Sequence, residues 1–289
     1  MIIITGASGQ LGRLVVNQLL ERVPAEQLGV SVRDTSKVKD LEELGVRVRR
    51  GDYNDSDSLI HAFEGASQVL IVSSASLGDA ALEHHRTAIK AAKKAGAQRI
   101  HYTSQMGSSP VSYFPPMVDH AATEAELQTS GTAFTSLRNG FYAGSALMML
   151  GDALESGVLA APEDGPVAWT THSDLAEAAA IVISEGGLHG VTPVLTGSET
   201  VDLAGIAAMA SELTGRLIRR IVITDDEYRA GLLAHGLPEE RADMFVGLFK
   251  AMRNGEFART DKALAQLLGR VPSGMREVLK VVISERSNR

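Results

Sequence analysis

Three glycines near the start of the chain have a spacing suited to phosphate binding. The segment Gly6-Ala-Ser-Gly9-Gln-Leu-Gly12 follows a short apolar run and precedes an amphipathic stretch. Small residues let a backbone turn sharply from strand to helix and approach a pyrophosphate, while the helix N-terminus offers free N–H groups and a positive dipole. A tight turn without a ligand is the alternative, because a chain with 28 glycines contains spaced triplets by chance. The context favours a dinucleotide cradle formed by Gly6, Ala7, Ser8, Gly9, Gln10, Leu11 and Gly12.

Basic residues at the end of the second predicted strand indicate which dinucleotide binds. Arg33 ends this strand, and Lys37 opens the next helix. At this position an arginine accommodates the 2′-phosphate of NADP, whereas an acidic residue binds the ribose hydroxyl of NAD. We therefore expect NADPH to be preferred over NADH, with Arg33 and Lys37 near the phosphate. Two alternatives stay open: Asp34 can take a ribose hydroxyl, and Arg33 can simply end the strand in solvent.

Polar or small residues also follow the next three predicted strands, at the edge where ligands of open parallel sheets bind. Asp52 and Tyr53 follow the third strand, where a carboxylate can accept from an adenine amino group and an aromatic ring can border the base. Asp52 as an ordinary loop residue or helix cap is the alternative. The small residues Ser73, Ser74 and Ala75 lie where the chain passes over the cofactor, and Tyr102-Thr103-Ser104 ends the fifth strand.

The elements that must position these residues alternate regularly. Apolar runs predict buried strands over residues 2–5, 28–33, 69–73, 99–103 and 133–137, and the alternating run 46–50 predicts an edge strand. Amphipathic stretches predict helices over 11–20, 35–44, 57–63, 80–95 and 121–127. This order is typical of an α/β fold with a Rossmann-type doubly wound parallel sheet, which we place in residues 1–143.

The rest of the chain, residues 144–289, is less regular and is expected to form a smaller, mostly helical substrate or cap region. One later strand, near 193–197, is expected to return to the sheet. Helices are predicted over 173–184, 203–213, 225–236, 239–252 and 262–268.

Composition excludes several classes of function. The net charge of −7 argues against a generally basic surface for nucleic acid, and no apolar run is long enough to span a membrane. Without cysteine the chain has no disulfide, thiol nucleophile or thiolate metal site. No metal site is expected, and the neighbouring His84 and His85 are expected to be solvated. The start of the chain lacks a basic n-region, so we expect no signal peptide and a cytoplasmic protein.

One absence concerns catalysis. Typical short-chain reductases use a Tyr-x-x-x-Lys pair, in which the lysine lowers the pKa of the tyrosine that acts as the acid. The residues four positions after the five tyrosines are Asp57, Met106, Met117, Ala146 and Leu232. Ordinary ketone or alcohol chemistry by that pair is therefore not expected.

Six segments together resemble a known family. They are Met1-Ile-Ile-Ile-Thr-Gly-Ala-Ser-Gly-Gln-Leu-Gly12, Val32-Arg33, Gly51-Asp-Tyr53, Tyr102-Thr-Ser104, His120-Ala-Ala-Thr-Glu124 and Leu137-Arg-Asn-Gly-Phe-Tyr142. Nearly from end to end, the chain resembles the NmrA-like atypical short-chain dehydrogenase/reductases, above all NADPH-dependent quinone oxidoreductases and triphenylmethane reductases. The resemblance implies flavin-free hydride transfer from NADPH to a quinone or another small, planar, conjugated acceptor. Two alternatives remain: a reductase of azo or triphenylmethane dyes, and a non-catalytic redox sensor that binds NADP(H).

The resemblance also implies roles for single residues. It places Ser73 to Ala75 and Thr103 along the cofactor, and Asn139, Gly140, Phe141 and Tyr142 at its nicotinamide end. Members similar to isoflavone reductases have a catalytic lysine after the fifth strand, where this chain has His120. His120 and Tyr142 are thus the candidate proton donors.

For His120 the alternative is a helix-start residue bonded to nearby backbone. Glu124, one turn on, is expected to form a pair or a cap. Trp169 is expected either to wall a planar substrate or to pack between the two halves of the chain.

Overall fold

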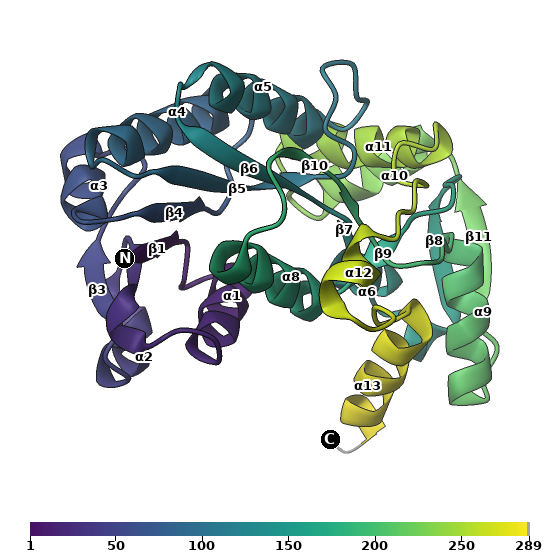
Figure 1. Cartoon of the computed structure of the whole chain (residues 1–289). Coiled ribbons are helices and arrows are strands. Elements are labelled where there is room, and N and C mark those ends of the chain that lie inside the picture. Colours follow the sequence, from purple (N-terminus) through teal and green to yellow (C-terminus); the bar gives the residue numbers. More distant parts are fainter. Residues whose placement is uncertain (288–289) are drawn as a thin grey trace. The chain divides into compact units, whose positions relative to one another are not determined.

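The computed structural model, which describes residues 1–287, contains a seven-stranded sheet (Figure 1). Its strands are β1 (Ile2–Thr5), β2 (Leu28–Val32), β3 (Arg47–Arg50), β4 (Gln68–Ile71), β5 (Arg99–Gln105), β6 (Ala133–Asn139) and β10 (Gly190–Leu195). They lie in the order β10-β6-β5-β4-β1-β2-β3. Each neighbouring pair from β6 to β3 is parallel. The predicted fold class is confirmed.

The strand order creates a place for a ligand. From β1 the chain proceeds outward through β2 and β3, and then returns to β4 on the other side of β1. Connections leave the carboxyl ends of β1 and β4 in opposite directions, which opens a crevice at that edge of the sheet.

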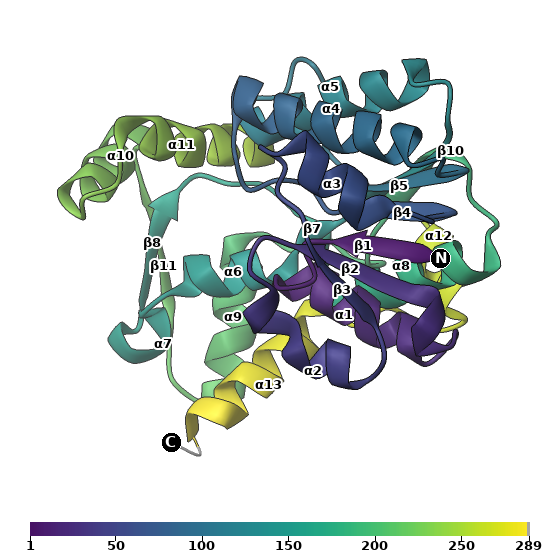
Figure 2. The same ribbon diagram turned by 90° about the vertical axis from the view of Figure 1, so that its left-hand side faces the viewer.

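Helices cover both faces of this sheet. They are α1 (Gln10–Leu20), α2 (Lys39–Glu43), α3 (Ser56–Phe63), α4 (Gly78–Lys94), α5 (Pro115–Thr129) and α8 (His172–Glu185), with 3₁₀ turns at Ala25–Gln27 and Thr35–Val38. Figure 2 shows α3, α4 and α5 over one face and α1 and α8 over the other. On the first face, Phe63, Ile71, Ile100 and Leu127 belong to one buried apolar cluster. On the second, α1 packs against α8, whose alanines allow close approach.

The burial of each strand matches the apolar pattern of its sequence. Every residue of β1 and β2 is buried, as expected for strands covered on both sides. The strand β3, with the alternating sequence Arg-Val-Arg-Arg, lies at the end of the sheet and is half-buried to exposed. The predicted edge strand is therefore confirmed.

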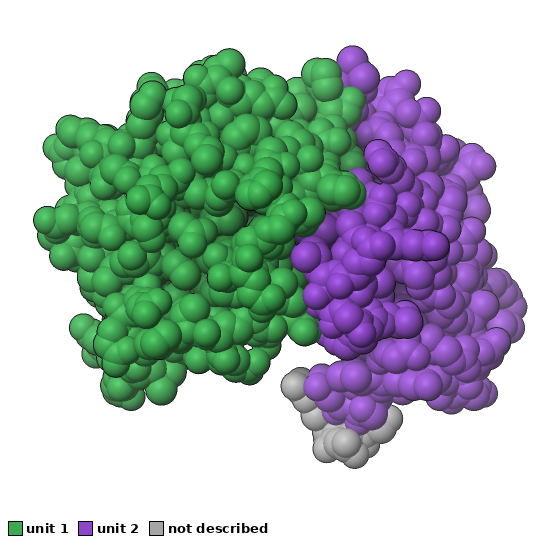
Figure 3. Space-filling model, in the orientation of Figure 1, with its two compact units in different colours: residues 1–110, 116–139, 172–193 green, residues 111–115, 140–171, 194–289 purple. Residues whose placement is uncertain are grey.

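The described residues group into two compact units, which Figure 3 shows in different colours. The first holds Met1–Pro110, Pro116–Asn139 and His172–Pro193; the second holds Val111–Pro115, Gly140–Thr171 and the chain from Val194 on. The limit predicted at residue 143 stays a prediction, and α8 groups with the first unit. The strand β10 overlaps the one expected near 193–197.

The second unit is mostly helical. Its helices are α6 (Ala143–Leu150), α7 (Ala153–Ser156), α9 (Leu203–Thr214), α10 (Asp225–Ala234), α11 (Glu239–Arg253), α12 (Ala263–Leu268) and α13 (Met275–Ser287). Two small sheets were not expected: β7 (Phe141–Tyr142) pairs with β9 (Trp169–Thr170), and β8 (Val158–Pro162) with β11 (Arg219–Ile223). Two-residue strands carry no periodicity, and β11 exposes Ile221 and Val222 instead of forming a buried run.

A buried histidine lies in the central sheet. His101 of β5 places Nε2 2.7 Å from the Oε1 atom of Gln68 in β4, and Gln68 Nε2 donates to the carbonyl of Ile183 in α8. An amide oxygen only accepts, so the His101 proton is on Nε2. Burial lowers the pKa of His101 to about 3, so the ring is neutral in the folded protein near neutral pH.

We predict that His101 makes folding stability depend on pH. The unfolded chain takes up this proton near pH 6.5, but the folded protein does so only near pH 3. The stability is fully present above pH 6.5 and falls by up to about 1.4 kcal/mol per pH unit between these values. Urea unfolding at pH 7 and 5.5 should show that His101→Gln removes about 1 kcal/mol of the wild-type difference.

The matched control is His61→Gln, because the His61 side chain is exposed in the folded protein. This substitution should leave the difference between pH 7 and 5.5 unchanged. An equal pH dependence of the wild type and His101→Gln would contradict the assignment.

Candidate functional site

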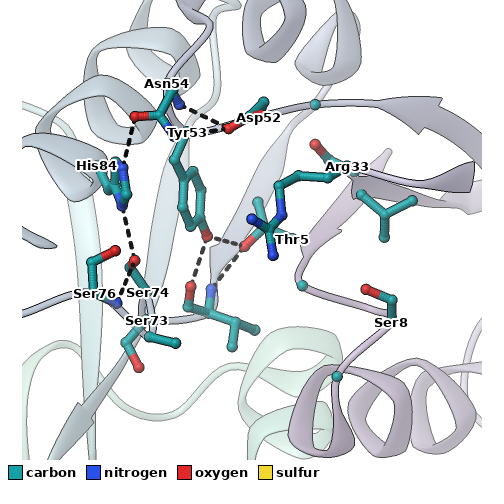
Figure 4. A pocket seen from close by; sticks show the side chains of 17 residues that line it. Thr5, Ser8, Arg33, Asp52, Tyr53, Asn54, Ser73, Ser74, Ser76 and His84 are labelled. Atoms are coloured by element: carbon teal, nitrogen blue, oxygen red, sulfur yellow. Dashed lines mark hydrogen bonds between the residues drawn. The ribbon is translucent and has the colours of Figure 1, made fainter. Parts of the chain in front are cut away.

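A cavity of about 410 Å³ opens at the carboxyl ends of β1 to β4 (Figure 4). Its walls come from the turn after β1, the end of β2, the segment after β3 and the segment after β4. Its lining includes nine residues predicted from the sequence: Gly6, Ser8, Gly9, Arg33, Asp52, Tyr53, Ser73, Ser74 and Ala75. It also includes eight residues that sequence reasoning missed: Thr5, Ser31, Val32, Gly51, Asn54, Val72, Ser76 and His84.

The glycine turn has the geometry expected of a phosphate cradle. Gly6 has a φ of 65°, which favours glycine, and its carbonyl accepts from the Gly9 N–H at 2.9 Å. Gly9 caps α1 with extended backbone and no side-chain bond, so free N–H groups of the first helical turn face the cavity end of the helix. A Cβ atom on Gly12 would lie 2.4 Å from the Gly6 carbonyl oxygen, so only glycine lets the helix approach the turn this closely.

We predict that Gly12→Ala destabilises the turn. The added methyl group must displace backbone, which costs about 1–3 kcal/mol of unfolding free energy for such overpacking. Urea unfolding measures this loss. Gly9→Ala is the matched control in the same turn, because its Cβ atom would lie 3.4 Å from the same oxygen and its φ is −94°. Equal losses in the two variants would show that the close approach at Gly12 is not the constraint.

Arg33 is the cation of the cavity. Its side chain lines the cavity and forms no hydrogen bond or ion pair with another residue in the described part of the chain. Asp34 is engaged elsewhere, because its carboxylate accepts from the N–H and hydroxyl of Ser36 and caps the following 3₁₀ turn. These hydrogen bonds lower the pKa of Asp34. Lys37 does not line the cavity. The guanidinium is thus free for an anion while the neighbouring carboxylate is occupied.

Ser31 is the clearest residue that sequence reasoning missed. Its side chain is buried, and its Oγ atom has no hydrogen-bond partner in the described chain. A Cβ atom on Gly51 would lie 2.0 Å from this oxygen, so glycine is required beside it. An unpaired buried hydroxyl costs about 1–3 kcal/mol, which a polar ligand recovers. Ser31 stands two residues before Arg33, the spacing that shares one side of a strand, and this was the signal available in the sequence.

Ser31, Arg33 and the glycine turn fit an adenosine phosphate. The turn offers backbone N–H groups to a pyrophosphate, the arginine offers a charge to a further phosphate, and the serine offers a hydroxyl.

Asp52 and Tyr53 have different roles. The Oδ1 atom of Asp52 accepts from the backbone and side-chain nitrogens of Asn54, and its Oδ2 atom has no partner among the described residues. The Tyr53 hydroxyl donates to the Val72 carbonyl at 2.7 Å and lies 2.6 Å from Thr5 Oγ1. Burial raises the pKa of the Tyr53 phenol. Tyr53 therefore joins the ends of β1, β3 and β4, while Asp52 keeps one free acceptor oxygen.

His85 is not solvated, contrary to the expectation, and His84 keeps only part of its surface in solvent. His85 is buried, and its Nε2 atom accepts from the Ser74 N–H at 2.8 Å. His84 is half-buried, and its Nδ1 atom lies 2.9 Å from Ser74 Oγ. The expectation was wrong because the segment after β4 folds back beside the second turn of α4. Thr103 supports the same segment, since its Oγ1 atom accepts from the Ser73 N–H.

His120 lies within α5, so it is not a helix-start residue bonded to backbone. Its Nδ1 atom is 2.8 Å from the hydroxyl of Tyr102, a buried residue of β5. Burial lowers the pKa of His120 to about 4, and the nearby Glu124 carboxylate opposes this shift. The imidazole is therefore neutral at neutral pH.

Glu124 forms a pair, as expected. Its carboxylate accepts two hydrogen bonds from Arg138, through Nε at 3.0 Å and through a terminal nitrogen at 2.6 Å. Burial opposes ionisation, but these bonds and those from serine hydroxyls keep the pKa of Glu124 below its ordinary value. Ser104 and Ser108 supply these serine bonds, and the Ser136 hydroxyl also donates to the carboxylate. This cluster joins α5, which carries His120, to the carboxyl ends of β5 and β6.

Comparison with known proteins identifies the family. A family model described as NAD(P)H-binding matches residues 6–184. Quinone oxidoreductase 2 of Escherichia coli is 37% identical over 272 residues, which cover 93% of this chain and 94% of that protein.

Two solved structures share the whole fold. The NADPH complex of the E. coli NADPH-dependent quinone oxidoreductase has a TM-score of 0.92 and 35% identity, and covers 98% of this chain and 100% of that one. The NADP(H) complex of Citrobacter triphenylmethane reductase has a TM-score of 0.89 and 33% identity, with 97% and 99% covered.

The chain belongs to the NAD(P)H-binding family. The family resemblance inferred from the sequence is thereby confirmed.

Some residues expected to contact the cofactor of this NAD(P)H-binding protein do not line the cavity. They are Ala7, Gln10, Leu11, Gly12, Lys37, Thr103 and Asn139 in the first unit, and Gly140, Phe141 and Tyr142 in the second. Ala7 and Leu11 are buried, and Gly12 acts through the turn. Asn139 ends β6 with a buried Oδ1 atom that has no partner in the described chain.

In the second unit, Gly140 is required by its surroundings. A Cβ atom there would lie 2.1 Å from Thr170 Oγ1, and the Gly140 N–H donates to the Leu195 carbonyl. Trp169 is buried in this unit, with Nε1 donating to the Val201 carbonyl and its ring edge-on to Phe141. Packing within the second unit accounts for the Trp169 side chain.

The structure adds two negative findings for residues 1–287. It contains no cluster of three histidine, aspartate or glutamate side chains that would hold a metal ion. None of its helices combines the length and the apolar character that a membrane crossing requires.

Proposed function

We propose that this chain is an NADPH-dependent oxidoreductase that transfers hydride to a quinone or a similar conjugated acceptor without flavin. The family assignment and the two solved relatives, a quinone oxidoreductase and a triphenylmethane reductase bound to NADPH or NADP(H), support the proposal. The acceptor is a small, planar, hydrophobic molecule.

The observation that carries the choice of cofactor is the unpaired guanidinium of Arg33 in the cavity. We assign it to the 2′-phosphate, with the buried hydroxyl of Ser31 beside it. The backbone of Gly6 to Gly12 holds the pyrophosphate. The segment Ser73 to Ala75 borders the adenosine half. Asn139 to Tyr142 are assigned to the nicotinamide end.

The chemistry needs little acid catalysis from the protein. Bound NADPH supplies the hydride, so the chain contributes position and electrostatics. Reduction of a quinone leaves an oxyanion that resonance stabilises, which removes the need for a strong acid. This agrees with a sequence in which no tyrosine has a lysine four residues on.

His120 and Tyr142 are the proposed donors to the acceptor. We assign the Tyr102 hydroxyl as donor to His120 Nδ1, which leaves the imidazole proton on Nε2 for an acceptor oxygen. Because burial holds the pKa of His120 near 4, the donor is a neutral imidazole throughout the neutral range.

We predict that Arg33→Ala weakens the use of NADPH far more than that of NADH. A charge-assisted contact is worth about 1.5 kcal/mol or more, so the Michaelis constant for NADPH should rise at least about tenfold. The constant for NADH should stay within about twofold, because NADH has no 2′-phosphate to lose. Steady-state kinetics with both cofactors measures the two changes.

The matched control is Arg50→Ala. Arg50 ends the neighbouring strand β3, pairs with Asp55 and lies outside the cavity. It should leave both constants unchanged. Lys37→Ala, at the other cation predicted near the phosphate, tests whether that residue takes part. Equal effects of Arg33→Ala on both cofactors would show that Arg33 is not the phosphate ligand.

The activity itself is tested by loss of absorbance at about 340 nm with NADPH and a panel of benzoquinones, with no flavin added. We expect turnover with quinones and faster oxidation of NADPH than of NADH. Azo and triphenylmethane dyes belong in the same panel, because the Citrobacter relative is a triphenylmethane reductase.

Absence of turnover with every acceptor would refute the enzyme. Calorimetric titration then separates the remaining possibilities. A redox sensor binds NADP⁺ and NADPH with different affinities and without turnover, whereas no binding of either form would overturn the cofactor assignment.

A further inference from the structure

Two neighbouring histidines of α4 hold the same serine from two sides. His85 binds the backbone N–H of Ser74, and His84 binds its hydroxyl. The other nitrogen of the His84 ring, Nε2, lies 2.9 Å from the Oδ1 atom of Asn54. The chain Asn54–His84–Ser74 therefore crosses the cavity wall from the segment after β3 to the segment after β4, and all three residues line the cavity (Figure 4).

Asp52 determines the hydrogen positions in this row of hydrogen bonds. The Asn54 amide nitrogen donates to Asp52 Oδ1, so the amide oxygen faces His84. An amide oxygen only accepts, and the His84 proton is therefore on Nε2. The Nδ1 atom then has a lone pair, to which the Ser74 hydroxyl donates.

His85 fixes the backbone of Ser74, whose hydroxyl belongs to this row of hydrogen bonds. A backbone N–H only donates, so His85 Nε2 is unprotonated and its proton lies on Nδ1, 2.8 Å from Thr123 Oγ1. The Thr123 hydroxyl donates in turn to the Asp119 carbonyl. Burial lowers the pKa of His85 to about 3, which agrees with a neutral ring. The Ser74 backbone, at one end of this row of hydrogen bonds, is thus held in place by His85.

The row of hydrogen bonds ends at the Asp52 carboxylate, of which one oxygen is unpaired. Asn54 donates twice to Asp52 Oδ1, through its backbone and its side chain, and Asp52 Oδ2 has no partner in the described residues. The carboxylate lines the cavity beside Tyr53. An oxygen held in this way accepts hydrogen bonds and repels another oxygen, so it distinguishes an amino group from a carbonyl group at the same position of a ligand.

We propose that Asn54 and His84 are positioning residues that orient Asp52 to select adenine by its 6-amino group. The proposal rests on the proposed function, which places the adenosine part of NADPH in this cavity. Ser74 anchors the array, His84 directs the Asn54 amide, and Asn54 turns Asp52 Oδ2 toward the base. The hypoxanthine analogue of NADPH, which has an oxygen in place of the amino group, is then a poor ligand.

The test compares the dissociation constants of NADPH and its hypoxanthine analogue, measured by the fluorescence of the reduced nicotinamide that both carry. The wild type should bind NADPH at least about tenfold more tightly, as expected for a hydrogen bond to a charged group. Asp52→Ala should abolish this preference. A merely structural role of His84 would change the melting temperature without changing the ratio of the two constants.

Two conservative variants distinguish the two hydrogen bonds of His84, one to Asn54 and one to Ser74. A glutamine amide reaches the position of Nε2, so His84→Gln keeps the bond to Asn54 and should keep the preference. An asparagine amide reaches only the position of Nδ1, so His84→Asn keeps the bond to Ser74, loses Asn54, and should reduce the preference to about threefold or less. Asn54→Ala breaks the same link from the other side and keeps the test decisive if His84→Asn does not fold.

Each outcome decides a different claim. A preference that persists in both His84→Asn and Asn54→Ala overturns the positioning role. A wild type that binds both nucleotides equally overturns the selection of adenine but leaves the proposed function intact. A wild type that binds neither nucleotide overturns the proposed function itself.

Discussion

The approach of α1 to the carbonyl group of Gly6 is the constraint on which the sheet edge with the cavity depends. Gly12 allows this approach because it has no Cβ atom. The Gly6 N–H donates to the Ser31 carbonyl of β2, and the Gly6 carbonyl accepts from Gly9, so one turn connects β1, β2 and α1. Arg33 directly follows β2, so the free N–H groups of α1 and the candidate cation are connected through the same turn. The proposed phosphate cradle and the proposed cofactor selector are therefore parts of one backbone arrangement.

The buried polar side chains of the described residues are mostly uncharged. Burial keeps His85, His101 and His120 neutral, so each serves as a fixed donor and acceptor. Glu124 and Asp174 are the buried carboxylates of the described residues, and Arg138 with three serine hydroxyls compensates the charge of Glu124. In a protein of net charge −7, an anionic cofactor needs local positive groups. Backbone N–H groups at the start of α1 and the guanidinium of Arg33 are the groups proposed for this task.

The parts of this structure that were predictable from sequence depend on local patterns. The strands, the edge position of β3, the glycine turn and Arg33 at the cavity each follow from runs or spacings of neighbouring residues. His84 and His85 were misjudged because their partner, Ser74, returns to the helix from outside it. Ser31 was missed because a buried serine in an apolar strand gives no sign that its hydroxyl is unpaired. The small sheets of the second unit were missed because two-residue strands and an exposed β11 lack a readable period.

The candidate cofactor residues and three of the candidate acceptor residues belong to different units. All residues that line the cavity lie in the first unit, whereas Gly140, Phe141 and Tyr142 lie in the second. Under the proposed function, substitutions at these three residues change the use of the acceptor and leave Arg33, Ser31 and the glycine turn intact. The chain is similar to reductases of two different acceptors, a quinone oxidoreductase and a triphenylmethane reductase. Under the proposed function, the residues that decide the acceptor are to be sought at the end of β6 and beyond it, where Asn139 keeps an unpaired amide oxygen.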